Sequence, residues 1–296
     1  MKILQFGENG QVSWELNRSL LPLGELIVLG RKDADFAEPE NLRKIISDIN
    51  PDLIINAVAY TAVDKAEEEE QLASVINATA PGVIAEEAAK INALFVSYST
   101  DYVFDGNNEA GYLENHKTNP VNAYGRTKLA GEQAIQSSGC DYLIFRTSWV
   151  YASRGHNFLL TILRLAKEKS ELKIISDQFG SPTSARLIAE TTLLCINKAM
   201  VQRKAGVFVS DLYHLTTSGN TSWHGFATEI IGLANRSSDD FLAVNDIKAI
   251  PSTEYPVAAQ RPANSKLQTN KLEQAFEIEM PFWKAALDLC LREVIT

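Results

Sequence analysis

Cysteine and histidine are scarce in this chain of 296 residues. The three cysteines, Cys140, Cys195 and Cys290, are odd in number, lie far apart and form no Cys-x-x-Cys pair. This spacing excludes a disulfide framework and a zinc knuckle. The four histidines show no metal-ligand spacing, so we expect no histidine-based metal site.

Positive charge and long apolar runs are scarce as well. Lysine and arginine number 28 against 37 aspartates and glutamates, which gives a formal net charge of −9. An acidic surface repels phosphate backbones, so we expect no nucleic-acid partner. No apolar run approaches the roughly 20 residues of a membrane span. The first seven residues have the pattern of a short strand rather than a signal peptide. These features predict a cytoplasmic protein without a membrane partner.

Short apolar runs alternate with longer amphipathic stretches in the first half of the chain. Strands are expected at 3–6, 26–29, 53–56, 94–97 and 142–145. Helical patterns follow at about 10–20, 39–49, 71–91 and 123–137. Short apolar strands that are each followed by a helix indicate a parallel sheet buried on both faces. The expected fold class is therefore α/β, a doubly wound parallel sheet of the Rossmann type.

This alternation loosens after about residue 150. Helical patterns recur at 157–169, 184–200, 223–234, 271–276 and 282–293, and short strands are expected at 172–175, 213–215 and 247–250. We therefore predict a dinucleotide-binding domain over residues 1–150. Residues 151–296 are expected to form mainly a smaller mixed lobe that binds substrate, with some elements returning to the first domain.

A glycine turn joins the first expected strand to the first expected helix. It runs Gly7-Glu8-Asn9-Gly10-Gln11-Val12-Ser13, with the spacing Gly-x-x-Gly-x-x-Ser. Glycines at such a turn let the backbone approach a pyrophosphate, and the helix N-terminus presents free N–H groups to it. An ordinary turn between strand and helix is the alternative. The position between a strand and a helix favours a dinucleotide cofactor.

The end of the second expected strand bears on the choice of cofactor. NAD-specific sites often carry an acid here that binds the ribose 2′-hydroxyl. This chain has Gly30 instead, followed by Arg31 and Lys32. Arg31 could pair with the 2′-phosphate of NADPH. The alternative is that Arg31 and Lys32 are ordinary solvated charges at a strand end and bind no ligand. We expect NADPH, with NADH as the alternative.

Three residues suggest a catalytic group. Thr100 follows the fourth expected strand, and the carboxyl ends of such strands are where ligands bind. Tyr124 and Lys128 are four residues apart, hence on one face of a helix. A cation about 4 Å away could lower the pKa of a tyrosine by ~3 units and make it a general acid. The alternative is that Tyr124 and Lys128 have no catalytic role, because a tyrosine and a lysine four residues apart are common on surface helices.

At this point the sequence resembles the extended short-chain dehydrogenases/reductases and, within them, the dTDP-4-dehydrorhamnose reductases. The resemblance runs over nearly the whole chain. Tyr-x-x-x-Lys is typical of the whole superfamily, whereas segments 148–151, 177–183 and 261–265 are much more specific. The matching segments are 7–16, 56–67, 99–105, 122–132, 145–151, 177–183 and 261–265.

The resemblance implies roles for individual residues. Tyr124 would be the general acid, Lys128 its electrostatic partner and ribose ligand, and Thr100 would orient the substrate oxygen. Thr100 and Asp101 would touch the sugar, and Trp149 would pack on it. We expect Arg261 to contact the substrate pyrophosphate; an arginine that packs between domains is the alternative. The expected cofactor-binding residues are Gly7, Gly10, Gln11, Val12, Arg31, Asp35, Phe36, Ala59, Tyr60, Thr61, Tyr98, Tyr124 and Lys128.

Some members of the family use magnesium at carboxylates near a dimer contact. Glu15 and Glu293 occupy matching positions here, as weak candidates, and Arg186 stands where a third acid is expected. An arginine there opposes metal binding, so we predict no metal site and leave magnesium dependence open. A homodimer is the assembly that the resemblance suggests.

The activity implied is NADPH-dependent reduction of the C4 keto group of dTDP-4-dehydro-6-deoxy-L-mannose to dTDP-L-rhamnose. One alternative is another nucleotide-sugar epimerase, dehydratase or reductase of the superfamily. A dehydratase usually carries an acidic pair beside the catalytic threonine, but Asp101 and Tyr102 follow Thr100 here. The other alternative, a non-catalytic regulatory subunit, would tend to lose the tyrosine or the lysine.

Overall fold

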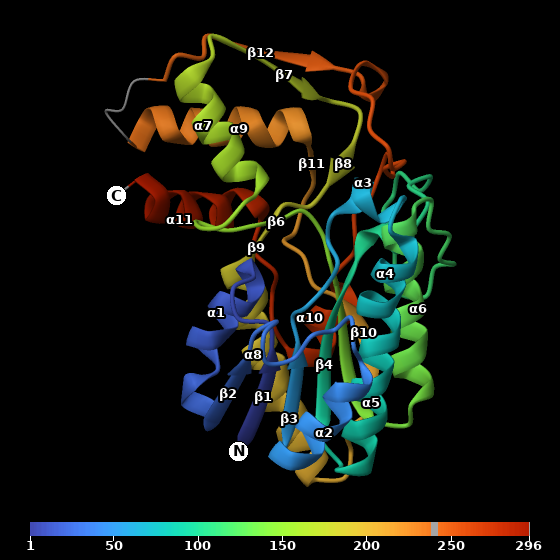
Figure 1. Cartoon of the computed structure of the whole chain (residues 1–296). Coiled ribbons are helices and arrows are strands. Elements are labelled where there is room, and N and C mark those ends of the chain that lie inside the picture. Colours follow the sequence, from blue (N-terminus) through green and yellow to red (C-terminus); the bar gives the residue numbers. More distant parts are fainter. Residues whose placement is uncertain (238–241, 296) are drawn as a thin grey trace.

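A central parallel sheet organises the larger part of the computed structural model, which describes residues 1–237 and 242–295 (Figure 1). Within these residues the sheet has six strands in the order β10-β5-β4-β3-β1-β2. The chain order reverses between β1 and β3, and ligands bind at such a switch point in doubly wound sheets. The strands are β1 (Lys2–Phe6), β2 (Glu25–Leu29), β3 (Leu53–Asn56), β4 (Leu94–Thr100), β5 (Asp141–Thr147) and β10 (Asp211–His214).

Helices cover both faces of the sheet, as the apolar strands require. Side chains of β1, β3, β4 and β5 alternate between two buried clusters, so that Leu53 and Ile55 pack on one face and Ile54 on the other. One face packs against α1 (Gln11–Ser19), α8 (Ala185–Lys204) and α10 (Asn270–Phe276). The other packs against α2 (Glu40–Ile49), α5 (Ala80–Lys90) and α6 (Ala123–Ser137). The α/β fold class is confirmed.

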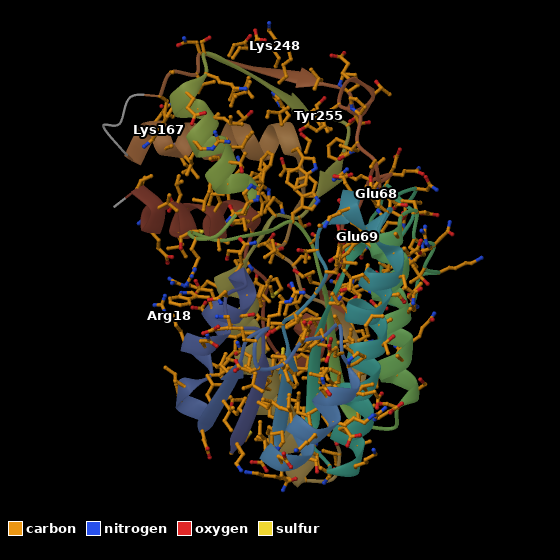
Figure 2. All side chains as sticks on the ribbon, viewed as in Figure 1. Arg18, Glu68, Glu69, Lys167, Lys248 and Tyr255 are labelled. Carbon is orange, nitrogen blue, oxygen red and sulfur yellow. The ribbon has the colours of Figure 1, made fainter. Side chains whose placement is uncertain are left out.

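The helix expected over 71–91 is interrupted. It consists of α4 (Glu70–Ser74), a π-helical segment η2 (Val75–Thr79) and α5, preceded by the short α3 (Val63–Ala66). The π segment carries Asn77, whose side chain accepts from Tyr60 N at 2.8 Å and donates to Thr127 at 3.1 Å. It therefore joins the loop after β3 to α6. Glu69, labelled in Figure 2, accepts from the Tyr60 hydroxyl at 2.6 Å and supports the same loop.

A smaller lobe lies above the carboxyl ends of the sheet strands (Figure 1). Its helices α7 (Phe158–Glu168), α9 (Trp223–Ser237) and α11 (Trp283–Ile295) enclose a separate apolar cluster. Strands β7 (Glu171–Ile175) and β12 (Asp246–Ile250) pair in parallel above them. Two-residue strands, which were not predicted, pair as β6 (Val150–Tyr151) with β9 (Thr183–Ser184) and β8 (Phe179–Gly180) with β11 (Thr221–Ser222).

Elements from beyond residue 150 also complete the larger domain. Strand β10 pairs with β5, and α8 packs on the sheet beside α1 (Figure 1). One-turn 3-10 helices, η1 (Leu21–Leu23), η3 (Asp101–Val103) and η4 (Ser252–Glu254), lie in connections. Among the described residues, no helix combines the length and apolar character that crossing a membrane requires.

Candidate active site

A cavity of about 460 Å³ opens at the switch point of the sheet. Most of the residues expected to bind a cofactor line it, together with residues from the ends of β1, β2 and β3. From the expected set the cavity contains Gly7, Gly10, Arg31, Asp35, Phe36, Ala59, Tyr60 and Thr61. The structure therefore gathers three separate segments around one elongated site, which is the arrangement that a dinucleotide needs.

The glycine turn is shaped by close packing. Gly7 has φ of +102°, a conformation that favours glycine, and a Cβ there would lie 2.7 Å from the Ser13 Oγ. Ser13 is itself buried under the turn, so its small side chain keeps the helix close to the strand. Both observations explain the residue types at these two positions.

Arg31 lies at the edge of this cavity with 82% of its side chain exposed. It lies near Asp35, with 3.7 Å between its Nε and a carboxylate oxygen. The sequence did not predict a third group, Glu8, whose carboxylate would come within 2.8 Å of a Cβ at Gly30. The cavity thus offers a largely exposed guanidinium for a phosphate, but also acids near the same strand end.

Five of the expected cofactor residues do not line this cavity: Gln11, Val12, Tyr98, Tyr124 and Lys128. The first three direct their side chains elsewhere. The Gln11 amide oxygen accepts from Asn157 at 2.9 Å, and Val12 packs into the core. The Tyr98 hydroxyl lies 2.9 Å from Thr192 Oγ1 on α8. Contacts of Gln11 and Val12 with a phosphate would therefore come from their backbone N–H groups at the start of α1.

The expected catalytic residues converge where β4 and α6 meet. Asn122 caps α6 by accepting from Gly125 N at 2.8 Å. A Cβ at Gly125 would lie 2.1 Å from the Tyr102 carbonyl oxygen, so glycine lets α6 approach the end of β4. This approach places Tyr124 in edge-on contact with Tyr102, at 5.8 Å between ring centroids, and beside Thr100.

Tyr124 is protonated at neutral pH in this site. Burial, and secondarily the charge of Asp101, raises the pKa of the phenol to about 12, although Thr100 opposes the rise by hydrogen bonding. We expected a neighbouring lysine to lower this pKa. The loss of hydration on burial outweighs any such effect, and the phenol keeps the proton that a general acid donates.

Asp101 occupies an unusual environment. It is 2% exposed, accepts from the Thr100 hydroxyl at 3.0 Å, and its second carboxylate oxygen is buried without a hydrogen-bond partner. Burial raises the pKa of this carboxyl group to about 7, against the opposing effect of Ser265 and Thr100. An unpaired acceptor beside Thr100 suits the hydroxyl of a bound sugar.

Lys128 is buried and donates to the Tyr98 carbonyl oxygen at 2.6 Å. Burial lowers the pKa of its ammonium group to about 8, while Glu132 acts in the opposite direction. The lysine is thus fixed on the end of β4, one helical turn from Tyr124. The structure therefore brings Thr100, Tyr124 and Lys128 together as expected from their spacing.

The two remaining substrate candidates have protein partners. The Trp149 ring stacks on Trp223 at 3.5 Å between centroids, and Gly180 packs so closely that a Cβ would lie 2.4 Å from the indole. Arg261 forms a two-pronged ion pair with Asp64, at 3.1 and 2.8 Å. This pair ties α3 to segment 259–265, which is the packing role considered as the alternative for Arg261. Trp223 was not singled out from sequence, and Asp64 was noted only as part of the matching segment 56–67, without a role of its own.

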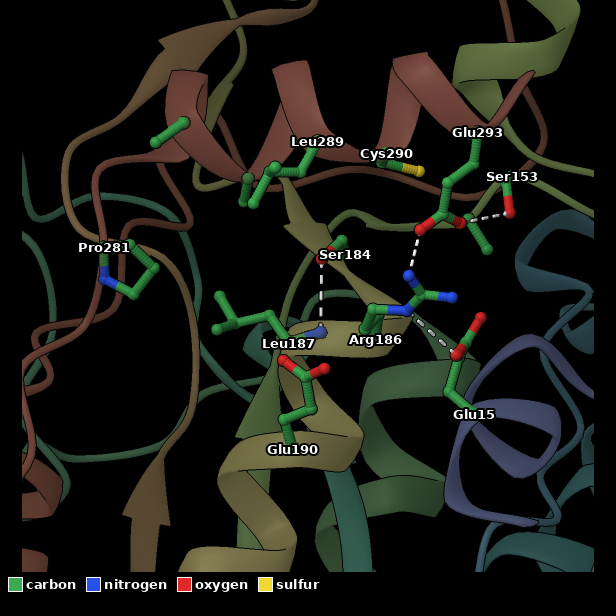
Figure 3. A pocket seen from close by; sticks show the side chains of 13 residues that line it. Glu15, Ser153, Ser184, Arg186, Leu187, Glu190, Pro281, Leu289, Cys290 and Glu293 are labelled. Atoms are coloured by element: carbon green, nitrogen blue, oxygen red, sulfur yellow. Dashed lines mark hydrogen bonds and ion pairs between the residues drawn. The ribbon is translucent and has the colours of Figure 1, made fainter. Parts of the chain in front are cut away.

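The carboxylates considered for magnesium surround an arginine. Arg186 on α8 donates to Glu15 on α1, at 3.3 Å, and to Glu293 on α11 (Figure 3). These three residues line a pocket, and Glu190 lines it too. Glu190 is an acid that was not predicted from the sequence. The guanidinium thus occupies the space between the two carboxylates, and these residues do not fit a metal ion. Within the described residues, no group of three or more His, Cys, Asp or Glu side chains could hold one.

Comparison with known proteins covers the whole chain. A family described as RmlD substrate binding domain matches residues 1–296. The dTDP-4-dehydrorhamnose reductase of Burkholderia thailandensis is 51% identical, over 100% of both chains. The corresponding Escherichia coli K12 enzyme is 46% identical, over 100% of this chain and 99% of that protein.

Solved structures of the same kind of enzyme match this chain over almost its full length. A dTDP-4-dehydrorhamnose reductase from Bacillus anthracis, in complex with NADP, is 35% identical with a TM-score of 0.88, over 99% of this chain and 100% of that one. Another from Clostridium acetobutylicum is 34% identical with a TM-score of 0.89, over 99% of both chains. The site, the fold and these full-length matches lead to one conclusion: the chain belongs to the dTDP-4-dehydrorhamnose reductase family, within the extended short-chain dehydrogenases/reductases.

Proposed function

We propose that this chain reduces the C4 keto group of dTDP-4-dehydro-6-deoxy-L-mannose with NAD(P)H and so forms dTDP-L-rhamnose. The observation that carries the proposal is the convergence of Thr100, Tyr124 and Lys128 where β4 and α6 meet. Tyr60, which lines the cavity at the switch point, packs against the same apolar cluster as Tyr124. This convergence occurs in a chain that is 51% identical, along its full length, to a dTDP-4-dehydrorhamnose reductase.

The chain's own groups divide the work at the carbonyl oxygen. Bound NAD(P)H supplies the hydride. Tyr124 donates its proton to the oxygen at which negative charge develops, and Thr100 orients that oxygen by hydrogen bonding. Lys128 stabilises the resulting phenolate by its charge. The buried carboxyl of Asp101 accepts from a sugar hydroxyl, which fixes the ring relative to Thr100.

NADPH is the proposed cofactor, with Arg31 pairing with its 2′-phosphate. The exposed guanidinium at the end of β2 and the NADP-bound relative support this choice. Glu8 and Asp35 near the same strand end favour NADH as the alternative. Arg261 is proposed to leave Asp64 and bind the substrate pyrophosphate when substrate is present. A phosphate and a carboxylate can accept the same pair of hydrogen bonds from a guanidinium group.

One assay tests the proposal directly. The rate of NADPH oxidation is measured with dTDP-4-dehydro-6-deoxy-L-mannose and with its UDP and GDP counterparts. We expect turnover with the dTDP sugar and formation of dTDP-L-rhamnose, identified by mass and by NMR of the product. Absence of turnover with all three sugars by a folded, NADPH-binding protein would refute the function.

A further inference from the structure

A buried ion pair lies behind the catalytic lysine. Glu132 on α6 accepts from Arg146 on β5 through two hydrogen bonds, Nε to Oε1 at 2.8 Å and Nη2 to Oε2 at 2.6 Å. The two side chains are only 3% and 4% exposed. Arg146 also stands over the Phe104 ring, 5.0 Å from its centroid, which fixes the guanidinium from a second side.

The pair belongs to the same helix face as the catalytic residues. Tyr124, Lys128 and Glu132 follow one another at intervals of four residues on α6, so their side chains line up. A buried ion pair contributes little net stability on average, because desolvation offsets its attraction. Its presence one turn behind Lys128 therefore calls for a role other than stability.

Little water separates Glu132 from Lys128. Both line a cavity of only about 10 Å³, enough for a single water molecule, so bulk solvent does not screen their interaction. The lining residues come from η2, α5, β4, β5 and α6. Among them, the titratable groups besides these two are limited to Tyr98, whose pKa is raised by burial so that it stays neutral. The negative charge facing Lys128 is therefore that of Glu132.

We propose that Glu132, held in place by Arg146, is a positioning residue that keeps Lys128 protonated beside the reaction site. Without this carboxylate, the buried ammonium group of Lys128 would lose the negative charge that faces it. The lysine would then release its proton more readily and lose the charge that stabilises the phenolate of Tyr124. This inference rests on the proposed reductase mechanism.

The direction of the pKa shift at Lys128 agrees with this role. Burial lowers the pKa to about 8, and Glu132 is the group that limits the fall. Activity that depends on the charged lysine is therefore present below about pH 8 and declines as the pH rises through that value. Removing the carboxylate moves the decline to lower pH.

The test is the variant Glu132→Gln, which keeps the side-chain shape and removes the charge. We expect the alkaline limb of the kcat/KM profile to move to lower pH by about one unit or more, as is typical for loss of a nearby opposite charge. In parallel, the titration of Lys128 is followed by NMR of ¹³Cε-labelled lysine, with Lys128→Met used for assignment. The NMR titration is measured without turnover. Its result therefore tests this inference even if the substrate is not the proposed dTDP sugar.

Glu87→Gln is the matched control. Glu87 on α5 is similarly buried and accepts from Lys90 at 2.6 Å and Arg43 at 2.8 Å, away from the catalytic lysine. We expect it to lower the melting temperature without moving either titration. A uniform loss of rate at every pH in Glu132→Gln, with the Lys128 titration unchanged, would overturn the proposal and leave Glu132 a structural residue.

Glu132→Gln could fail to fold because Arg146 loses its charged partner. In that case a second variant tests the proposal. Glu132→Gln combined with Arg146→Met removes both buried charges and leaves an apolar side chain in place of the arginine. The Lys128 titration is still expected at lower pH than in the wild type. A titration unchanged in a folded double variant would refute the role of the pair.

Discussion

Tyr124 is the residue on which the proposed chemistry depends most directly. Its hydroxyl carries the proton at neutral pH, because burial and the charge of Asp101 disfavour the phenolate. A bound cofactor and the charge of Lys128 must therefore lower a pKa that starts near 12 rather than near its usual value. Proton donation is consequently tied to the occupied site.

Tyr124→Phe is expected to lose about 10²–10⁴-fold in kcat, the usual contribution of a general acid. The variant removes one oxygen and keeps the ring contact with Tyr102. NADPH affinity, measured by fluorescence titration, should change little. A variant that keeps more than about a tenth of the wild-type kcat would remove Tyr124 from the proton-donor role.

Arg31→Ala is expected to weaken NADPH binding roughly 10- to 150-fold, which corresponds to loss of a charge-assisted contact worth about 1.5–3 kcal/mol. NADH has no 2′-phosphate, so its affinity should change little. The ratio of the two dissociation constants is the measurement. Equal weakening of both cofactors would show that Arg31 does not read the phosphate.

Single residues were predictable from sequence when a local motif carried them. Thr100, Tyr124 and Lys128 were found through strand-end position and helical spacing. Glu132 lies in the same helix, but its partner Arg146 is on β5, so its significance depends on tertiary contact. The stack of Trp149 on Trp223 joins residues 74 positions apart for the same reason.

At the scale of elements, hydrophobic periodicity predicted the long helices and the strands of the sheet within a few residues. The π-helical segment at Val75–Thr79 was not predictable, because periodicity cannot distinguish it from the helices on either side. The two-residue strands of the smaller lobe carry no period at all. They lie among tertiary contacts such as the packing of Trp149, next to β6, against Gly180 in β8, which a local pattern does not reveal.

The approach of α6 to β4 makes a prediction about Gly125. Gly125→Ala adds a Cβ only 2.1 Å from the Tyr102 carbonyl oxygen. Because this distance is far shorter than a van der Waals contact, α6 must move. We expect lower thermal stability and loss of activity, since Tyr124 and Lys128 move with the helix. The melting temperature and kcat/KM are measured together.

Gly232→Ala is the matched control for this prediction. Gly232 also lies within a helix, α9, where a Cβ would meet only the Arg236 side chain at 3.5 Å. Alanine is favoured over glycine in a helix interior by about 1 kcal/mol, so this variant should be as stable as the wild type or more so. A melting temperature equally lowered in both variants would contradict the argument from close packing.

At the scale of the whole molecule, Arg186 joins the parts of the chain. Its ion pairs connect α1 and α8 of the larger domain to α11 of the smaller lobe. The Ser153 hydroxyl donates to the same Glu293 at 3.0 Å. The resemblance placed Glu15, Glu293 and Arg186 at one site, but the sequence could not show that the arginine pairs with both glutamates, which are 171 and 107 residues away.

This arrangement predicts that magnesium is not required. Arg186 supplies the positive charge that Glu15 and Glu293 would otherwise offer to a metal, and it places a cation where an oxygen ligand belongs. A ligand at about 100 times its dissociation constant would stabilise the fold by about 2.7 kcal/mol, which a melting curve detects. We expect activity to survive EDTA, and no melting shift between millimolar magnesium and EDTA at matched ionic strength. A clear shift that disappears in Glu15→Gln would show that a metal binds despite Arg186.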